Sequence, residues 1–183
     1  YSNVPLVLLW SPNGTELKTF VEAKVGSASR KVQAQEFYFR PGLTWPRRTQ
    51  SGLGMRVMPG GCIFADKGPA AFVEDNDQME LMSLLAITNS TTYCRLVELQ
   101  MAFGSYEVGV IQRTPIPDFE IHRREREDLA SLSRNAWGLK RSADVSSSTT
   151  YAFQTPALLV GHGATLNERS NKWSDYIHTS EGD

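Results

Sequence analysis

The stretch that decides the fold is Asp77-Gln-Met-Glu-Leu-Met-Ser-Leu-Leu-Ala-Ile-Thr-Asn-Ser90, together with the chain that follows it as far as Asn135. Asp77 and Glu80 have the spacing of a helix capping box, and the leucines and methionines after them form an apolar face. Asn89 interrupts this helix, and Ser90 can cap a second apolar run that ends at Phe103. The stretch therefore predicts two consecutive helices whose apolar residues belong to the core.

The next segment has a different character. It reads Gly104-Ser-Tyr-Glu-Val-Gly-Val-Ile-Gln-Arg-Thr-Pro-Ile-Pro117. Val108, Val110 and Ile111 are β-branched and predict a strand, which the two prolines would end because proline has no backbone donor. We expect Tyr106, Glu107 and Gln112 to hold the junction between helix and strand.

A charged helix is predicted after Pro117, with Asp118 as its cap. Its Arg and Glu or Asp residues recur four apart, as in Arg123 with Glu127 and Arg124 with Asp128, which is typical of a solvated helix face. Its expected inward side consists of Leu129, Leu132 and Ala136. A polar linker is expected over residues 142–150, and a last amphipathic helix carries Leu166, Trp173, Tyr176 and Ile177.

Upstream of Asp77 the patterns indicate strands. We expect strands over Val4–Trp10 and Thr19–Val25, paired as a hairpin, and further strands at Gln35–Arg40, Cys62–Ala65 and Ala70–Val73. The predicted fold class is α+β, a mixed and mostly antiparallel sheet with packed helices, followed by a helical spacer and tail. The predicted domains are an α/β domain at 1–118, a spacer helix and linker at 119–160, and a helical tail at 161–183.

Charge is balanced over the whole chain but not along it. The 183 residues include 19 Lys and Arg against 20 Asp and Glu, and 40% are hydrophobic, which suffices for a core of domain size. The total charge neither indicates nor excludes nucleic acid. Between residues 40 and 67, however, basic residues outnumber acidic ones, and Asp66 is the one acid there. A basic face is therefore expected.

The cysteines and the apolar runs bear on the compartment. Cys62 and Cys94 are too few for a disulfide framework and indicate buried thiols in a reducing environment. The run Val4–Trp10 is broken by Pro5 and is too short to cross a bilayer. We therefore expect a soluble, cytoplasmic protein without membrane contact. The missing initiator Met and the opening inside a predicted strand suggest a piece of a larger protein.

The segment 41–61 is long for a loop without regular structure, and such loops are commonly functional. Arg47 and Arg48 can bind phosphates or a guanine edge, and Trp45 offers a ring that either stacks on a base or anchors the loop in the core. Neutral side chains nearby can contact phosphates or bases, and these alternatives stay open. The predicted DNA-binding residues are Arg40, Thr44, Trp45, Arg47, Arg48, Thr49, Gln50, Ser51, Arg56 and Lys67.

The order of these elements resembles the specificity region of large adenine-specific DNA methyltransferases, of the kind found in type IIG restriction–modification and in the BREX and DISARM phage-defence systems. The resemblance covers roughly Phe37 to Leu159, and Phe39-Arg-Pro-Gly-Leu-Thr-Trp45 and Gly104 to Pro117 are its most specific pieces. It implies a target-recognition domain that reads double-stranded DNA, beside a catalytic methyltransferase domain of the same chain that binds S-adenosylmethionine.

No catalytic, cofactor-binding or metal site is predicted in the chain itself. It has no Asn-Pro-Pro-Tyr tetrapeptide to hold an extruded adenine and no Phe-x-Gly-x-Gly turn for the cofactor. His122, His162 and His178 pair with neither cysteine at ligand spacing. By the resemblance, S-adenosylmethionine belongs to the parent protein and this piece alone does not methylate.

A second hypothesis stays open from the sequence. The last amphipathic helix and the aromatic segment at Gln35–Arg40 could dock onto a partner protein of a defence complex, without direct DNA contact. It predicts salt-tolerant association and no footprint on DNA. No nucleophile–base spacing supports a third possibility, a small hydrolase.

Overall fold

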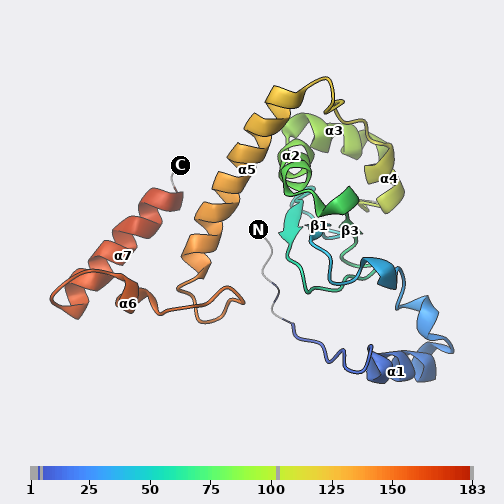
Figure 1. Ribbon diagram of the computed structural model, residues 1–183, viewed down its shortest axis with the longest axis horizontal. Coiled ribbons are helices and arrows are strands. Elements are labelled where there is room, and N and C mark those ends of the chain that lie inside the picture. The colour runs from blue at the N-terminus through green and yellow to red at the C-terminus, as the bar shows by residue number, and fades with distance from the viewer. Residues whose placement is uncertain (1–3, 5, 102–103, 182–183) are drawn as a thin grey trace. The chain divides into compact units, whose positions relative to one another are not determined.

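The computed structural model describes residue 4 and residues 6–101 and 104–181 (Figure 1). Its internal contacts divide these residues into two compact units. The first unit covers residues 8–133, and the second covers residues 134–181 with the described residues of the segment 3–7. The functional boundaries predicted after residues 118 and 160 stay predictions.

Two capped helices form the centre of the first unit. α2 (Gln78–Thr88) begins at Asp77, whose carboxylate accepts a hydrogen bond of 2.8 Å from the Met79 amide. α3 (Thr91–Gln100) begins at Ser90, whose hydroxyl accepts one of 3.2 Å from the Tyr93 amide. Both predicted caps are confirmed. The predicted end of the second run, Phe103, lies outside the described residues.

The sheet is small and antiparallel throughout. Its order is β2–β1–β3, where β1 is Gly42–Thr44, β2 is Arg56–Met58 and β3 is Ala70–Ala71. Together with the seven α-helices of the described residues, it confirms the α+β class. β1 and β2 are the two ends of the segment 41–61, so this predicted loop is a hairpin with a long connection.

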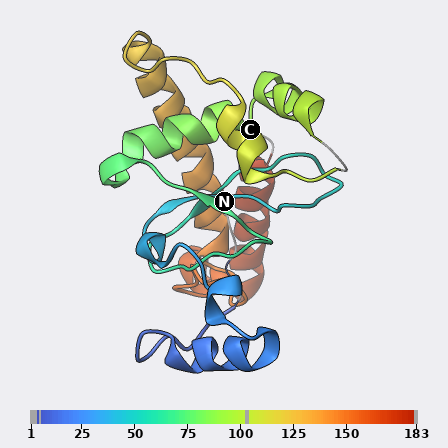
Figure 2. The same ribbon diagram turned by 90° about the vertical axis from the view of Figure 1, so that its right-hand side faces the viewer.

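The core joins this sheet to the helices. Leu43 and Trp45 on and after β1 pack in one cluster with Leu81 and Leu85 of α2 and Val97 of α3. α2 contacts β1, while α3 contacts both α2 and α4 (Val108–Arg113), as the two ribbon views show (Figure 2). The central leucines are therefore core residues, as their spacing predicts.

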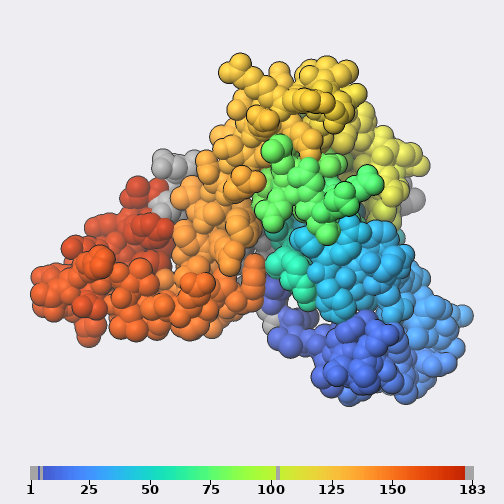
Figure 3. All heavy atoms as spheres, viewed as in Figure 1, coloured from blue at the N-terminus to red at the C-terminus, as the bar shows by residue number. Residues whose placement is uncertain are grey.

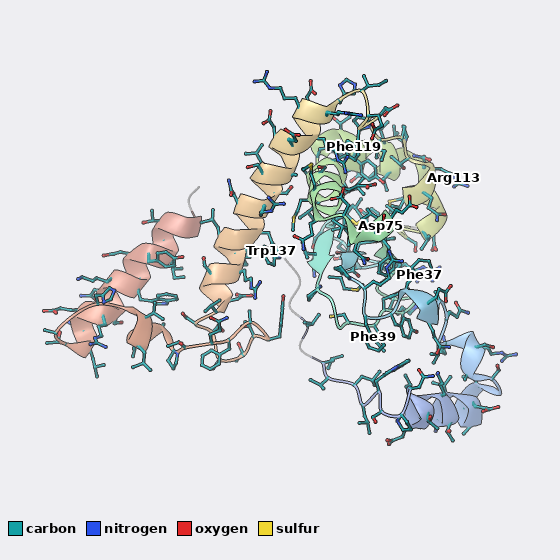
Figure 4. All side chains as sticks on the ribbon, viewed as in Figure 1. Phe37, Phe39, Asp75, Arg113, Phe119 and Trp137 are labelled. Atoms are coloured by element: carbon teal, nitrogen blue, oxygen red, sulfur yellow. The ribbon has the colours of Figure 1, made fainter. Side chains whose placement is uncertain are left out.

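The predicted aromatic strand at Gln35–Arg40 is wrong. Gln35–Phe37 forms a 3-10 helix instead, and the chain then turns through Phe39, which has a φ of 68°. The rings pack on one another rather than along a ladder: Phe37 (labelled in Figure 4) stacks on Phe72 with centroids 5.2 Å apart. In the space-filling view light-blue and green atoms adjoin each other (Figure 3). Arg40 donates a hydrogen bond of 2.9 Å to the side chain of Asn76, which precedes α2.

The predicted N-terminal hairpin is also wrong. Residues Thr15–Val25 form the helix α1, which ends at Gly26 with a φ of 81°, and the described residues of Val4–Trp10 form no strand; Pro5 lies outside them. The alternation of apolar and polar residues extends over too few residues to distinguish the period of a strand from that of a helix. Glu, Ala, Leu and Lys are strong helix formers, and the glycine supplies the left-handed stop.

The strand predicted from Val108, Val110 and Ile111 is wrong, because these residues belong to the helix α4. Glu107 before it has an extended backbone, and Val110 points into the core at 6% exposure. Burial of one helical face outweighs the modest strand preference of valine and isoleucine. Cys62–Ala65 is not a strand either, since Ala65 forms only an isolated bridge with Gly68, whereas β3 lies within the predicted Ala70–Val73.

The charged helix is α5 (Arg123–Asp144), so it extends into the predicted linker, and Asp118 caps a turn before it by accepting from the Glu120 amide. Its inward face is shifted from the predicted one: Ala130 and Ser133 are buried, whereas Leu132 is 65% exposed. The shift follows from Ser83, whose hydroxyl lies 2.9 Å from the Arg126 carbonyl and fixes the helix rotation.

Arg126 of α5 does not belong to a solvated helix face. Its side chain is 17% exposed and pairs with Asp77 at 2.8 Å, beneath the ring of Phe119. Arg123 pairs with Glu120 rather than with Glu127.

The second unit contains the end of α5, the short α6 (Ala157–Val160) and α7 (Leu166–Glu181), so the predicted last helix is confirmed. Trp137 (labelled in Figure 4) lies on α5 with the Arg141 guanidinium 5.1 Å from its ring. In the described part of the chain, none of the helices combines the length and apolar content that crossing a membrane requires.

Candidate nucleic-acid interface

Arg47, one of the predicted DNA-binding residues, forms an ion pair with Glu107 across 60 residues of sequence. Its Nε and Nη2 donate hydrogen bonds of 3.1 and 2.8 Å to Oε1, and Nη2 lies 2.7 Å from Oε2. The side chains are 35% and 43% exposed, so the pair lies at the surface and not in the core. The guanidinium is thus held along the edge formed by Nε and Nη2.

The backbone brings the two partners together. Arg48 forms an antiparallel bridge with Ser105, and the Tyr106 amide donates a hydrogen bond of 2.8 Å to the Arg47 carbonyl. On the other side, the Arg47 amide donates one of 3.1 Å to the Lys67 carbonyl. Three segments distant in sequence therefore meet at Arg47.

Ser105 completes the site. It is buried, and its hydroxyl donates a hydrogen bond of 2.7 Å to Oε1 of Glu107. The hydrogen bond from Arg47 and the one from Ser105 lower the pKa of Glu107 from its ordinary value, and the same carboxylate raises the pKa of Arg47. Both groups are therefore charged at neutral pH.

Three of the predicted basic residues are exposed. Arg48, Arg56 and Lys67 are called the basic patch below, and all three lie near the end of β1. Arg48 follows this strand, Arg56 pairs with Thr44 in the sheet, and the Lys67 carbonyl accepts a hydrogen bond from the Arg47 amide. Among the described residues, none of the three forms an ion pair with a carboxylate. Their charges are available to an external anion.

The neutral residues of the predicted site differ in exposure and in hydrogen bonding. Gln50 and Ser51 are exposed, and Thr49 accepts a hydrogen bond of 3.1 Å from the Ser51 amide. Thr44 donates one of 2.9 Å to the Pro69 carbonyl. Of these, Gln50 and the Ser51 hydroxyl have the exposure that a contact with DNA requires.

Arg40 and Trp45 are placed in internal contacts. The Arg40 guanidinium lies beside the stacked rings of Phe37 and Phe72, 5.4 and 5.5 Å from their centroids, and donates a hydrogen bond of 2.8 Å to the Val73 carbonyl. Trp45 is 2% exposed. Of the two alternatives for Trp45, the structure has the ring that anchors the loop in the core.

A cavity of about 490 Å³ opens beside the ion pair. Arg47 and Glu107 line it together with Arg30, Lys31 and Phe64. Sequence reasoning missed Glu107, Arg30 and Lys31 as site residues because they lie far from the basic loop in sequence, and no local spacing indicates that they meet it. Glu107 was expected only to hold a junction.

The cysteines and histidines form no further site. Cys62 and Cys94 are free and half-buried, less buried than expected, and burial raises the pKa of both thiols. Within the described ranges, no group of three or more His, Cys, Asp or Glu residues could hold a metal ion.

Comparison with known proteins identifies two methyltransferases that are similar to this chain. Adenine-specific methyltransferase PglX of Lacticaseibacillus casei (strain Zhang) is 25% identical over 178 residues, which cover 95% of this chain and 14% of PglX. Adenine-specific methyltransferase BrxX of Escherichia coli O9:H4 (strain HS) is 26% identical over 141 residues, 75% of this chain and 11% of BrxX. No family model matches the chain.

The chain is therefore related to adenine-specific methyltransferases, which confirms the coarser part of the resemblance. It spans only 14% and 11% of the length of these two relatives.

Proposed function

We propose that this chain is the double-stranded DNA recognition module of an adenine-specific DNA methyltransferase of a restriction–modification or phage-defence system. The observation that carries the proposal is the basic patch, three exposed cations near one end of the sheet that form no ion pair with any described carboxylate, in a chain related to such methyltransferases. Exposed cations without acidic partners are the groups that neutralise DNA phosphates.

The mechanism divides the predicted residues into two groups. Arg48, Arg56 and Lys67 dock on phosphates, and Gln50 and Ser51 extend the contact to further backbone or base atoms. Arg40 holds the loop in place through its hydrogen bond to the Val73 carbonyl, and Trp45 does so through its packing in the core cluster. The adenine chemistry and S-adenosylmethionine belong, in this proposal, to a catalytic domain elsewhere in the same parent protein.

The test is duplex binding by the full-length protein over a series of salt concentrations. The logarithm of the binding constant falls with the logarithm of salt by about 0.9 for each phosphate neutralised. Combined replacement of Arg48, Arg56 and Lys67 by Ala is expected to weaken binding and to make this slope less steep by about 2 to 3. Arg95→Ala is the matched control, because Arg95 is an exposed arginine on α3 that pairs with Glu98. Equal binding by the triple variant and the wild type would refute the proposal.

The second unit supports a second candidate function, a protein-interaction module. Several of its apolar side chains are exposed, including Leu159 at 67% and Leu166 at 69%, and an apolar cavity of about 550 Å³ lies beside Trp173. Exposed apolar groups of this kind are common at protein interfaces. If this function holds instead, the triple variant leaves DNA binding unchanged, and replacing Leu159 and Leu166 by Ser abolishes a salt-tolerant association.

A further inference from the structure

We propose that Arg47 reads the edge of a guanine base and that Glu107 is the residue that positions it, whereas the basic patch contacts phosphates. The inference rests on the proposed function and deepens it, because it assigns base reading and phosphate binding to different arginines of the same loop. Three observations carry it: the geometry of the pair, its net charge and its place in the cavity.

The geometry leaves one edge of Arg47 available. Glu107 occupies the edge formed by Nε and Nη2. Because a guanidinium is planar and has five N–H donors in fixed directions, the outer edge formed by Nη1 and Nη2 remains for a second acceptor. Among the described residues, Nη1 has no hydrogen-bond acceptor. Two adjacent acceptors in one plane, such as O6 and N7 of guanine, match this edge.

The charge of the pair selects a neutral ligand. The Glu107 carboxylate lies 2.7 Å from Nη2 and cancels most of the Arg47 charge. A phosphate approaching Arg47 would also approach this carboxylate and be repelled, whereas a neutral base edge keeps both hydrogen bonds without the repulsion. Arg48 next to it has no paired carboxylate among the described residues, so a phosphate suits Arg48 better.

The surroundings restrict the motion of the pair. Glu107 receives the Ser105 hydroxyl at 2.7 Å, and the Tyr106 amide bonds to the Arg47 carbonyl at 2.8 Å. The guanidinium is therefore oriented before any ligand binds, which lowers the conformational entropy lost on binding. Arg47 and Glu107 line the same cavity of about 490 Å³, so a base edge has access to the pair.

The experiment uses the full-length protein and a pool of duplexes with randomised sequence, from which bound duplexes are sequenced. Wild type is expected to select a guanine at one or more positions. Arg47→Met keeps a long side chain but has no N–H donor, and Glu107→Gln keeps the side-chain size but lacks the charge that orients Arg47. Each is expected to reduce the preference for guanine at one and the same position by about tenfold. Arg48→Ala is the matched variant, expected to weaken all duplexes alike and to leave this preference intact.

A chemical probe avoids dependence on how well the variants fold. Replacing the selected guanine by 7-deazaguanine removes the N7 acceptor and nothing else in the major groove. It is expected to weaken binding by wild type about five- to tenfold and to leave binding by Arg47→Met unchanged.

The outcomes separate the inference from the proposed function. If Glu107→Gln strengthens binding to every duplex and steepens the salt dependence, Arg47 is a phosphate contact that Glu107 masks, and the inference is overturned. Selection of no guanine, or a guanine preference that survives in Arg47→Met, also overturns it. Failure of wild type to bind duplex DNA at all contradicts the proposed function itself.

Discussion

The indole Nε1 of Trp45 donates a hydrogen bond of 2.9 Å to the carbonyl oxygen of Tyr106, 61 residues further along the chain. Both residues are buried, at 2% and 4% exposure. Arg47 lies two residues after Trp45, and Glu107 follows Tyr106 directly. This buried hydrogen bond therefore aligns the two backbone segments that carry the surface ion pair, and it links the core of the first unit to the candidate interface.

Replacing Trp45 by Phe is expected to lower the free energy of unfolding by about 2 to 4 kcal/mol, because it leaves the Tyr106 carbonyl unsatisfied and creates a small cavity. Urea-induced unfolding followed by circular dichroism measures the change. Leu132→Ala, at a side chain that is 65% exposed, is the control and should change the free energy of unfolding by about 0.5 kcal/mol or less. An unchanged unfolding midpoint for Trp45→Phe would contradict the anchoring role.

A substitution at Gly42 tests the close approach of β1 and β3. A Cβ at Gly42 would lie 2.6 Å from the backbone carbonyl oxygen of Ala71, so the two strands must move apart to accept it. Gly42→Ala is expected to destabilise the protein by about 1 to 3 kcal/mol in thermal or urea unfolding.

Gly54→Ala is the matched control for this substitution, because a Cβ at Gly54 meets no atom within 4 Å. It should be neutral, or stabilising by up to about 1 kcal/mol, through the smaller entropy of the unfolded chain. Equal destabilisation by both substitutions would show that the strand contact is not the cause.

Local signals in the sequence predicted the central helices correctly. The caps at Asp77 and Ser90 depend on side chains that bond to amides two or three residues away, so the neighbouring sequence contains the whole interaction. The strands and helices elsewhere depend on distant partners. Residues Val108–Arg113 form a helix because Val110 packs into a core built by α2 and α3, and valine's own preference does not indicate this.

The residues of the candidate site were also predictable only in part. The basic character of residues 40–67 is visible in the composition, and Arg48, Arg56 and Lys67 are exposed as a basic face requires. The partners of Arg40 and Arg47 were not predictable. They are Val73, Asn76 and Glu107, and nothing in their local sequence distinguishes them from other surface residues before the fold brings them together.

Ser83 tests the contact between α2 and α5. It is 0% exposed, and its hydroxyl lies 2.8 Å from the Met79 carbonyl and 2.9 Å from the Arg126 carbonyl. Ser83→Ala is expected to lower the free energy of unfolding by about 1 kcal/mol. The hydroxyl is lost, but both carbonyls keep their backbone hydrogen bonds within their own helices. Ser83→Leu should cost more, since the site has no space for the added volume. Ser131→Ala, on the exposed face of α5, is the control for chemical unfolding, and a Ser83→Leu variant as stable as wild type would rule out the tight contact.

Glu107 gives the stability of the protein a defined pH dependence. Its pKa is lowered in the folded state by the hydrogen bonds from Arg47 and Ser105, so the folded protein binds the proton less tightly than the unfolded chain. The stabilisation is complete above the ordinary value of 4.5 and is lost as the pH falls through the lower folded pKa.

Glu107→Gln has no such proton, so the wild type should exceed this variant in stability by a constant amount at neutral pH. The difference should shrink once the pH falls below about 5. Urea midpoints measured in steps of pH for both proteins test this, with Glu127→Gln, an exposed glutamate on α5, as the control. A difference that stays constant down to acid unfolding, or grows as the pH falls, would show that Glu107 is not held by Arg47 in solution.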